Sequence, residues 1–103
     1  MNHKNISAEE FDKLSKEANT EIIDVRSPEE KVEGFIEGAK VINIMGPTFA
    51  EDIKSLDKDK TYLVYCRSGN RSSTACGFMA SNGFEKLYNL DGGIQAWNQY
   101  TNS

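Results

Sequence analysis

Cys66 is the residue of this sequence best placed to do covalent chemistry. It stands in the stretch YCRSGNRS, residues 65–72, directly after a hydrophobic run and ahead of Arg67 and Arg71. A reactive cysteine needs positive charge nearby to hold it as a thiolate, whereas a packing cysteine needs only apolar neighbours. Gly69 would let the loop curl so that its backbone N–H groups point inward, and the helix that follows would add the partial positive charge of its N-terminus. We therefore predict that Cys66 is a nucleophile.

The type of reaction follows from what surrounds this cysteine. A cysteine protease would need a histidine as base, and the single histidine, His3, lies in a terminal segment that we expect to be frayed, so acyl transfer is disfavoured. A tyrosine-phosphatase-type loop is the closer rival, but it has one residue more between its cysteine and its arginine than the four residues that separate Cys66 from Arg71. The shorter loop makes a tighter ring of amides, which suits a single sulfur atom better than a tetrahedral phosphate. Sulfur transfer is therefore favoured.

Composition and charge exclude several functional classes. The chain has 103 residues, with 12 lysines and arginines against 16 aspartates and glutamates, and its net charge of -4 argues against nucleic acid or an anionic membrane as the main partner. No stretch approaches the roughly 18 apolar residues of a membrane span or has the apolar core of a signal peptide, so we expect a cytoplasmic protein. Cys66 and Cys76 are too few for a disulfide framework, and with His3 they form no metal-ligand cluster, so no metal or cofactor is expected. The length predicts one domain, residues 1–103.

Alternating strands and helices indicate an α/β fold. Helices are predicted where capping residues precede apolar residues at helical spacing, and strands where β-branched runs stand between turn signals. Strands are expected at 21–25, 39–44, 61–65 and 85–90, and helices at 6–19, 27–35, 48–56, 72–82 and 94–100. This order predicts a parallel sheet with right-handed crossovers and helices on both faces. Functional residues then belong at the carboxyl ends of the strands, where Cys66 and Arg26 both fall.

Four motifs of this sequence occur together in one known family. They are DVRSPEE at 24–30, EGFIEGA at 33–39 ahead of INI at 42–44, CRSGNRS at 66–72, and LDGGIQAW at 90–97. In their order and spacing they resemble the single-domain rhodaneses, also called thiosulfate sulfurtransferases, over essentially the whole chain. The resemblance implies a rhodanese-like α/β fold, in which a single central parallel sheet of about five strands has helices on both faces.

The resemblance also implies an activity. The cysteine of such a protein takes the outer sulfur of a small anionic donor such as thiosulfate, forms a persulfide, and passes the sulfur to cyanide or a thiol. By position, Cys66 matches the catalytic cysteine, and Arg67 matches a loop position at which basic residues favour anionic donors. The residues that match the substrate-binding amide loop are Arg67, Ser68, Gly69, Asn70 and Arg71. Phe35 departs from the family, because it replaces the histidine of the usual G-H-I-x-G-A motif, so no hydrogen bond is carried over to this position.

Other residues near these motifs have structural interpretations. Asp24 and Arg26 are predicted to pair and to fix the strand end beside the loop. Arg71 closes the loop and is either a substrate ligand or tied to an acidic side chain. Cys76 is interpreted as a packed small residue rather than a resolving thiol, and Gly92–Gly93 as the turn before the last helix.

Three functional hypotheses remain open at this point. The first is a sulfurtransferase that uses Cys66 with a small anionic donor and a cyanide or thiol acceptor, including a thioredoxin-like or other protein thiol. The second is a sulfur-carrier or interaction module that delivers its persulfide to one protein partner. The third is a phosphatase- or arsenate-reductase-like enzyme. An intact Cys66 fits the first two hypotheses equally and does not separate them from each other, whereas the short loop disfavours the third.

Overall fold

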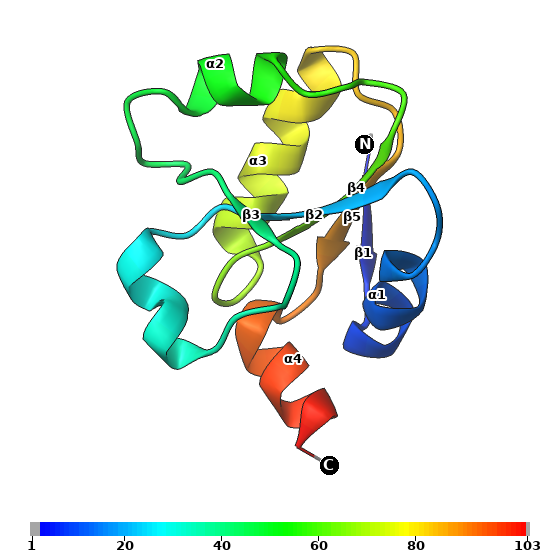
Figure 1. The fold of residues 1–103 in the computed structure, drawn as a ribbon, viewed down its shortest axis with the longest axis vertical. Coiled ribbons are helices and arrows are strands. Elements are labelled where there is room, and N and C mark those ends of the chain that lie inside the picture. Colours follow the sequence, from blue (N-terminus) through cyan, green and yellow to red (C-terminus); the bar gives the residue numbers. More distant parts are fainter. Residues whose placement is uncertain (1–2, 103) are drawn as a thin grey trace.

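A computed structural model describes residues 3–102 of the chain, which fold around one open sheet (Figure 1). All strand pairs are parallel, and the strand order is β1-β5-β4-β2-β3. The strands are β1 (Lys4–Ile6), β2 (Thr20–Asp24), β3 (Lys40–Val41), β4 (Thr61–Tyr65) and β5 (Leu87–Leu90). The helices are α1 (Ala8–Ser15), the 3-10 helix η1 (Pro28–Glu33), α2 (Phe49–Lys54), α3 (Asn70–Ser81) and α4 (Gly93–Thr101). The predicted parallel α/β fold is confirmed.

The central strand β4 divides the core into two parts. Residues 62 to 65 of this strand are fully buried, and alternate side chains point to opposite faces of the sheet, as the pleat of a strand requires. Tyr62 and Val64 pack with side chains of α2 and α3, whereas Leu63 and Tyr65 pack with side chains of α1 and α4. Helices therefore cover both faces of the sheet, as predicted (Figure 1).

The edge strand β1 is the element that the sequence pattern did not indicate. It has three residues, of which Lys4 and Asn5 are exposed, and its register places Ile6 beside Leu90 of β5. The prediction of a frayed N-terminal segment at His3 is wrong, because the ring Nε2 of His3 lies 3.2 Å from the Ser73 hydroxyl on α3. Pairing with β5 and this contact hold the segment against the sheet.

Several other predicted boundaries shift. The first helix ends at residue 15 rather than 19, and the segment after β2 forms a 3-10 helix whose cap, Gly34, has φ +119°. The strand predicted at 39–44 has two ladder residues, although the amides of Ile42 and Ile44 still bond the carbonyls of Asp24 and Val25. Among the described residues, no helix has the length and apolar character needed to cross a membrane.

Candidate active site

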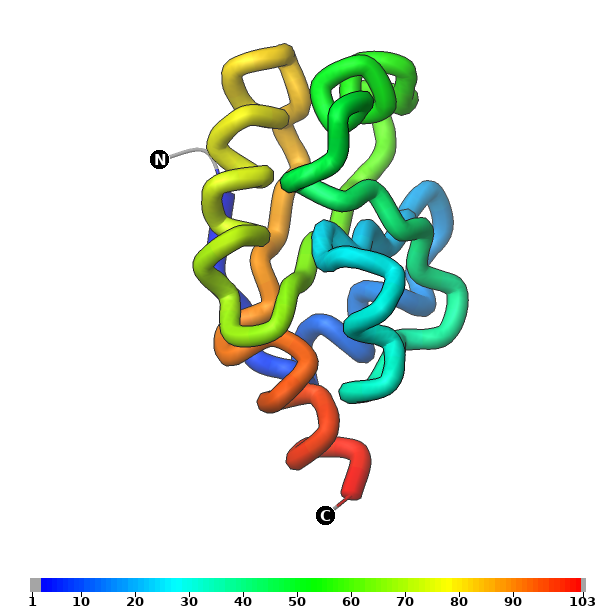
Figure 2. The backbone as a smooth tube through the Cα atoms, turned by 90° about the vertical axis from the view of Figure 1, so that its left-hand side faces the viewer, coloured from blue at the N-terminus to red at the C-terminus, as the bar shows by residue number. Residues whose placement is uncertain are grey.

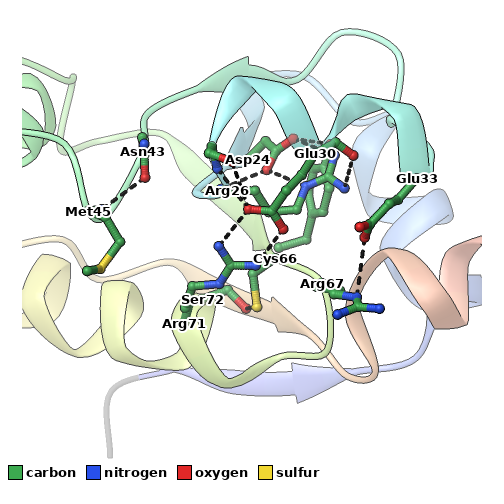
Figure 3. A network of polar contacts seen from close by, with 12 residues as sticks. Asp24, Arg26, Glu30, Glu33, Asn43, Met45, Cys66, Arg67, Arg71 and Ser72 are labelled. Carbon is green, nitrogen blue, oxygen red and sulfur yellow. Dashed lines mark hydrogen bonds and ion pairs between the residues drawn. The ribbon is translucent and has the colours of Figure 1, made fainter.

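The cysteine loop lies at the carboxyl end of β4, between this strand and α3 (Figure 3). Cys66 follows the last residue of β4, and Gly69, with φ +112°, is the N-cap residue of α3. This left-handed conformation costs a glycine little, and it allows the chain to reverse between strand and helix. The loop therefore lies at the carboxyl edge of the sheet, where the sequence analysis predicted the functional residues.

Hydrogen bonds converge on the sulfur of Cys66. The Gly69 N–H donates to Sγ at 3.1 Å, and the Ser72 hydroxyl lies 3.3 Å from the same atom. Burial of this residue, which is 1% exposed, would raise the pKa of the thiol, but hydrogen bonds from the Ser72 hydroxyl and from the Ser72, Gly69 and Ser68 amides outweigh it. The net effect lowers the pKa of Cys66, as a nucleophilic thiolate requires.

Ser72 is a site residue that sequence reasoning did not single out. Its buried hydroxyl contacts Cys66 Sγ, the side-chain carbonyl of Asn89 on β5, and the Gly69 carbonyl at 3.2 Å. A hydroxyl has one proton, so these acceptors compete for it, and a charged thiolate is the strongest acceptor among them. The signal in the sequence was a serine in the first turn of the helix that follows the nucleophile.

Asn89 joins this hydroxyl to the sheet. Its amide nitrogen donates to the Asn5 side chain at 2.9 Å and to the Gly69 carbonyl at 3.2 Å. These bonds link β1, β5 and the loop, and they fix the side of Asn89 that faces Ser72. A small polar cavity of about 150 Å³ adjoins this cluster, and it is lined by Asn5, Ser68, Gly69, Asn70, Ser73, Asn89 and Asp91.

The two loop arginines are held by carboxylates of η1. Arg71 donates to both carboxylate oxygens of Glu30, at 2.8 and 2.9 Å, and Arg67 pairs through Nε with Glu33 at 3.3 Å (Figure 3). Arg71 is thus tied to an acidic side chain, one of the two roles predicted for it. Arg67 is more open, since its side chain is 57% exposed.

The Glu30 carboxylate also accepts hydrogen bonds from Ser27. The bonds from Arg71 lower the pKa of Glu30 most, burial opposes them, and the Ser27 amide and hydroxyl lower it further, to about 2. Both Ser27 groups donate to one oxygen of this carboxylate, at 3.1 and 3.0 Å. The carboxylate therefore links the start of η1 to the cysteine loop.

Asp24 and Arg26 form the buried pair that the sequence predicted. The Arg26 guanidinium donates to both oxygens of Asp24, at 2.9 and 2.8 Å, and to the Glu30 and Gly34 carbonyls at 3.2 and 2.9 Å. The Tyr65 hydroxyl donates to Asp24 at 2.9 Å. Each side chain of the pair is at most 2% exposed, and the hydrogen bonds described for both are made with the protein.

Phe35 and Cys76, which the sequence also singled out, have other surroundings. Phe35, which replaces the usual family histidine, is half-buried, and the Lys31 ammonium lies 4.3 Å from the centre of its ring. Cys76 is fully buried in the core, where burial first and the charge of Cys66 second raise the pKa of its thiol to about 12. The two thiols therefore differ in the direction of their pKa shifts.

A larger cavity of about 530 Å³ lies elsewhere on the molecule. It is lined by residues between the end of α3 and the amino ends of β1 and β5, among them His3, Phe84 and Tyr88. The cysteine loop contributes no residue to it. The amide cradle around Cys66, rather than this larger cavity, is therefore the candidate reaction centre.

Comparisons with known proteins agree with this geometry. The rhodanese-like domain family matches residues 7–100. YtwF of Bacillus subtilis, a protein named as a putative sulfurtransferase, is 40% identical over 86 residues, which are 84% of this chain and 81% of that protein. GlpE of Pseudomonas putida, named a thiosulfate sulfurtransferase, is 32% identical over 94 residues, covering 91% of this chain and 84% of that protein. The crystal structure of a rhodanese-related protein from Thermoplasma volcanium has a TM-score of 0.82 at 33% identity and covers 94% of this chain and 92% of that one.

The open parallel sheet is an α/β fold, and the matched rhodanese-related structure has the same fold. The chain belongs to the rhodanese-like domain family, as its motifs indicated. The named activities of its relatives support sulfur transfer as the general activity of this chain.

The first prediction concerns Ser72. Ser72→Ala removes the side-chain donor to Cys66, and loss of a hydrogen bond to a charged group should raise the pKa of Cys66 by about one unit. The pH dependence of iodoacetamide alkylation, read by peptide mass, measures this pKa. Ser73→Ala is the matched control, because the Ser73 hydroxyl contacts His3 instead of the thiol. Equal pKa values in the two variants would remove Ser72 from the site.

The second prediction concerns the stability of the fold against acid. The pKa of Glu30 falls from an ordinary 4.5 to about 2 on folding, so its contribution is complete above pH 4.5 and is lost as the pH falls through about 2. At neutral pH, Glu30→Gln should lower the free energy of unfolding by about 1–2 kcal/mol, since the pair is partly exposed.

Urea unfolding at a series of pH values provides the test. The difference between the wild-type chain and Glu30→Gln should shrink between pH 4.5 and about 2. Glu29→Gln, which changes an exposed neighbour in the same 3-10 helix, is the control. A difference that stays constant over this interval would contradict the assigned role of the Glu30 carboxylate.

Proposed function

We propose that this protein is a sulfurtransferase that moves sulfane sulfur from thiosulfate, or a similar anionic donor, to cyanide or a thiol through a persulfide on Cys66. The observation that carries the proposal is the set of amide and hydroxyl donors around Cys66 Sγ, which lowers the pKa of a nearly inaccessible thiol. Donors arranged around one sulfur favour an anion at that place, either the thiolate or the terminal sulfur of a persulfide. The relatives named as sulfurtransferases support the same chemistry.

The first half of the reaction loads the cysteine. The Cys66 thiolate attacks the outer sulfur of thiosulfate, and a new sulfur–sulfur bond forms on the protein. The sulfur–sulfur bond of the donor breaks, and sulfite leaves with the electron pair. The transferred sulfur keeps its negative charge, so Cys66 becomes a persulfide anion. The total charge is the same before and after this step, and no proton is transferred.

The second half returns the free thiolate. Cyanide, or the thiolate of an acceptor, attacks the outer sulfur of the persulfide, and the sulfur–sulfur bond on Cys66 breaks with its electron pair left on the cysteine. The products are thiocyanate or an acceptor persulfide, together with the Cys66 thiolate. The amides of the loop serve both states, because each presents an anionic sulfur.

The loop residues have different roles in this proposal. Ser68, Gly69 and Asn70 carry amides of the cradle, Arg67 attracts the anionic donor, and Arg71 closes the loop through Glu30. Exposure of the Arg67 side chain and its contact through Nε support a steering role for its guanidinium. Asp24 and Arg26 support the site from within the protein.

The third prediction tests the nucleophile. Cys66→Ser should lose thiosulfate:cyanide sulfur transfer while keeping its fold, since a hydroxyl holds no transferable sulfur. Intact mass after incubation with thiosulfate should show the gain of one sulfur atom in the wild-type chain, and incubation with a thiol should remove it. Cys76→Ser is the matched control and should gain sulfur as the wild-type chain does.

Two results would contradict this mechanism. One is full transfer activity in Cys66→Ser, and the other is mapping of the added sulfur to Cys76. If thiosulfate does not load Cys66 but another sulfane donor does, the persulfide mechanism stands and thiosulfate is not the donor.

The fourth prediction concerns Arg67. Arg67→Ala should raise KM for thiosulfate several-fold with a smaller effect on kcat, because the charge attracts and holds the donor before the reaction. The effect should fade as ionic strength rises, since exposed charges are screened. Arg67→Lys keeps the charge, and its KM for thiosulfate should lie between those of the wild-type chain and Arg67→Ala. Equal KM values for the wild-type chain and Arg67→Ala at low salt would exclude the steering role.

A further inference from the structure

The N-terminus of α4 is bonded to the backbone of the cysteine loop, and the two segments lie side by side (Figure 2). The Ile94 amide donates to the Cys66 carbonyl at 2.9 Å, and the Gln95 amide donates to the Arg67 carbonyl at 3.4 Å. Both amides belong to the first turn of α4, where N–H groups have no acceptor within the helix. The loop carbonyls therefore cap this helix.

These two bonds also orient peptides of the loop, one of which carries an amide that faces the sulfur. In a planar trans peptide the C=O and the N–H point in opposite directions. The Arg67 carbonyl points toward α4, so the Ser68 N–H of the same peptide points toward Cys66. The hydrogen bond from this N–H is one of those that lower the pKa of the Cys66 thiol. The same geometry turns the Arg67 N–H away from α4.

The far side of the loop is anchored in the same way. The Gly69 carbonyl accepts from the Ser73 amide at 3.1 Å and from the Asn89 side chain at 3.2 Å. Carbonyls at three loop positions thus have donors outside the ring of amides. A carbonyl turned inward would instead place its negative end against the thiolate, so the outward bonds are a condition for the cradle.

Gly93 is the residue that lets α4 come this close. A Cβ atom at this position would lie 2.4 Å from the Arg67 carbonyl oxygen and 2.5 Å from that of Cys66, distances that real Cβ atoms essentially never show. Both neighbours are backbone atoms, so the conflict is not relieved by rotation of a side chain. Any side chain at 93 must separate α4 from the loop.

We propose that Gly93 is a positioning residue for the Cys66 thiolate, because its lack of a side chain lets the first turn of α4 hold the loop carbonyls outward. The inference deepens the proposed function, since it concerns the same thiolate. The sequence analysis interpreted Gly93 only as part of the turn before the last helix. The proposed role adds the positioning of the cysteine loop.

The fifth prediction is that Gly93→Ala raises the pKa of Cys66 by about one unit, which lowers the thiolate fraction about tenfold at a pH below both pKa values. The ultraviolet absorbance of the thiolate, titrated against pH, reads this shift without a reagent that must enter the site. Cys76 does not interfere at neutral pH, because burial raises its pKa to about 12.

Gly38→Ala and Gly77→Ala are the controls. Gly38 has φ +89° and open space where a Cβ atom would lie, so its substitution adds backbone strain without a clash. Gly77, on α3, adds neither. A rise in the Cys66 pKa as large in Gly38→Ala as in Gly93→Ala would overturn the inference, as would a folded Gly93→Ala with an unchanged pKa.

A second pair of variants decides the question if Gly93→Ala does not fold. Gln95→Pro removes the amide that bonds the Arg67 carbonyl, and proline is tolerated in the first turn of a helix. Gln95→Ala removes the same exposed side chain and keeps the amide. The pKa of Cys66 should be higher in Gln95→Pro than in Gln95→Ala, and equal values would overturn the inference.

This titration is independent of sulfur transfer. A wild-type chain with a low Cys66 pKa and no persulfide after incubation with thiosulfate would contradict the donor assignment and leave the role of Gly93 intact. Sulfur transfer in the wild-type chain together with an unshifted pKa in Gly93→Ala would do the reverse.

Discussion

The buried ion pair between Asp24 and Arg26 is the interaction on which the carboxyl edge of this sheet depends. Two opposite charges removed from water must satisfy each other and their remaining hydrogen-bonding groups. Arg26 meets this requirement by binding Asp24 at the end of β2 and two carbonyls, of Glu30 and Gly34, in and after η1. The 3-10 helix, which has no buried side chain of its own, is thereby attached to the sheet. The loop is attached in turn, because Glu30 of that helix holds Arg71.

The loop arginines are paired with carboxylates of the scaffold, and the hydrogen bonds that lower the pKa of Cys66 come from uncharged donors. The sequence suggested that Arg67 and Arg71 would stabilise the thiolate, yet each guanidinium has a carboxylate partner in η1. The effects that lower the pKa of Cys66 most are hydrogen bonds from one hydroxyl and three amides. Fixed dipoles of this kind are effective because they are already oriented before a charge develops. Burial is the largest single effect at both thiols, but at Cys76 the charge of Cys66 adds to it, so the pKa of Cys76 is raised.

The sequence predicted the sheet, both helical faces and the position of the cysteine loop at the end of β4, because periodicity, caps and turn residues are local signals. It did not indicate β1, whose three residues form a strand through their register with β5 and carry no apolar run. Nor did it indicate the carboxylate partners, since Glu30 and Arg71 are 41 positions apart and several acidic residues could have faced the loop. The Asp24–Arg26 pair was predictable because both residues lie on one strand end. Contacts that tertiary packing selects from many equivalent side chains have no local pattern.

Two helix N-termini meet at the cysteine loop, and they act on it in different ways. The first turn of α3 supplies the Ser72 hydroxyl and amide directly to the sulfur, so its partial positive charge lies beside the thiolate. The first turn of α4 acts from the outer side of the loop, because its amides bind the carbonyls of Cys66 and Arg67. Each carbonyl bonded in this way polarises its own peptide, and the amide at the opposite end of that peptide becomes a better donor. The helix α4 therefore strengthens the amide donors of the loop through its bonds to the loop carbonyls. These bonds depend on the absence of a side chain at Gly93.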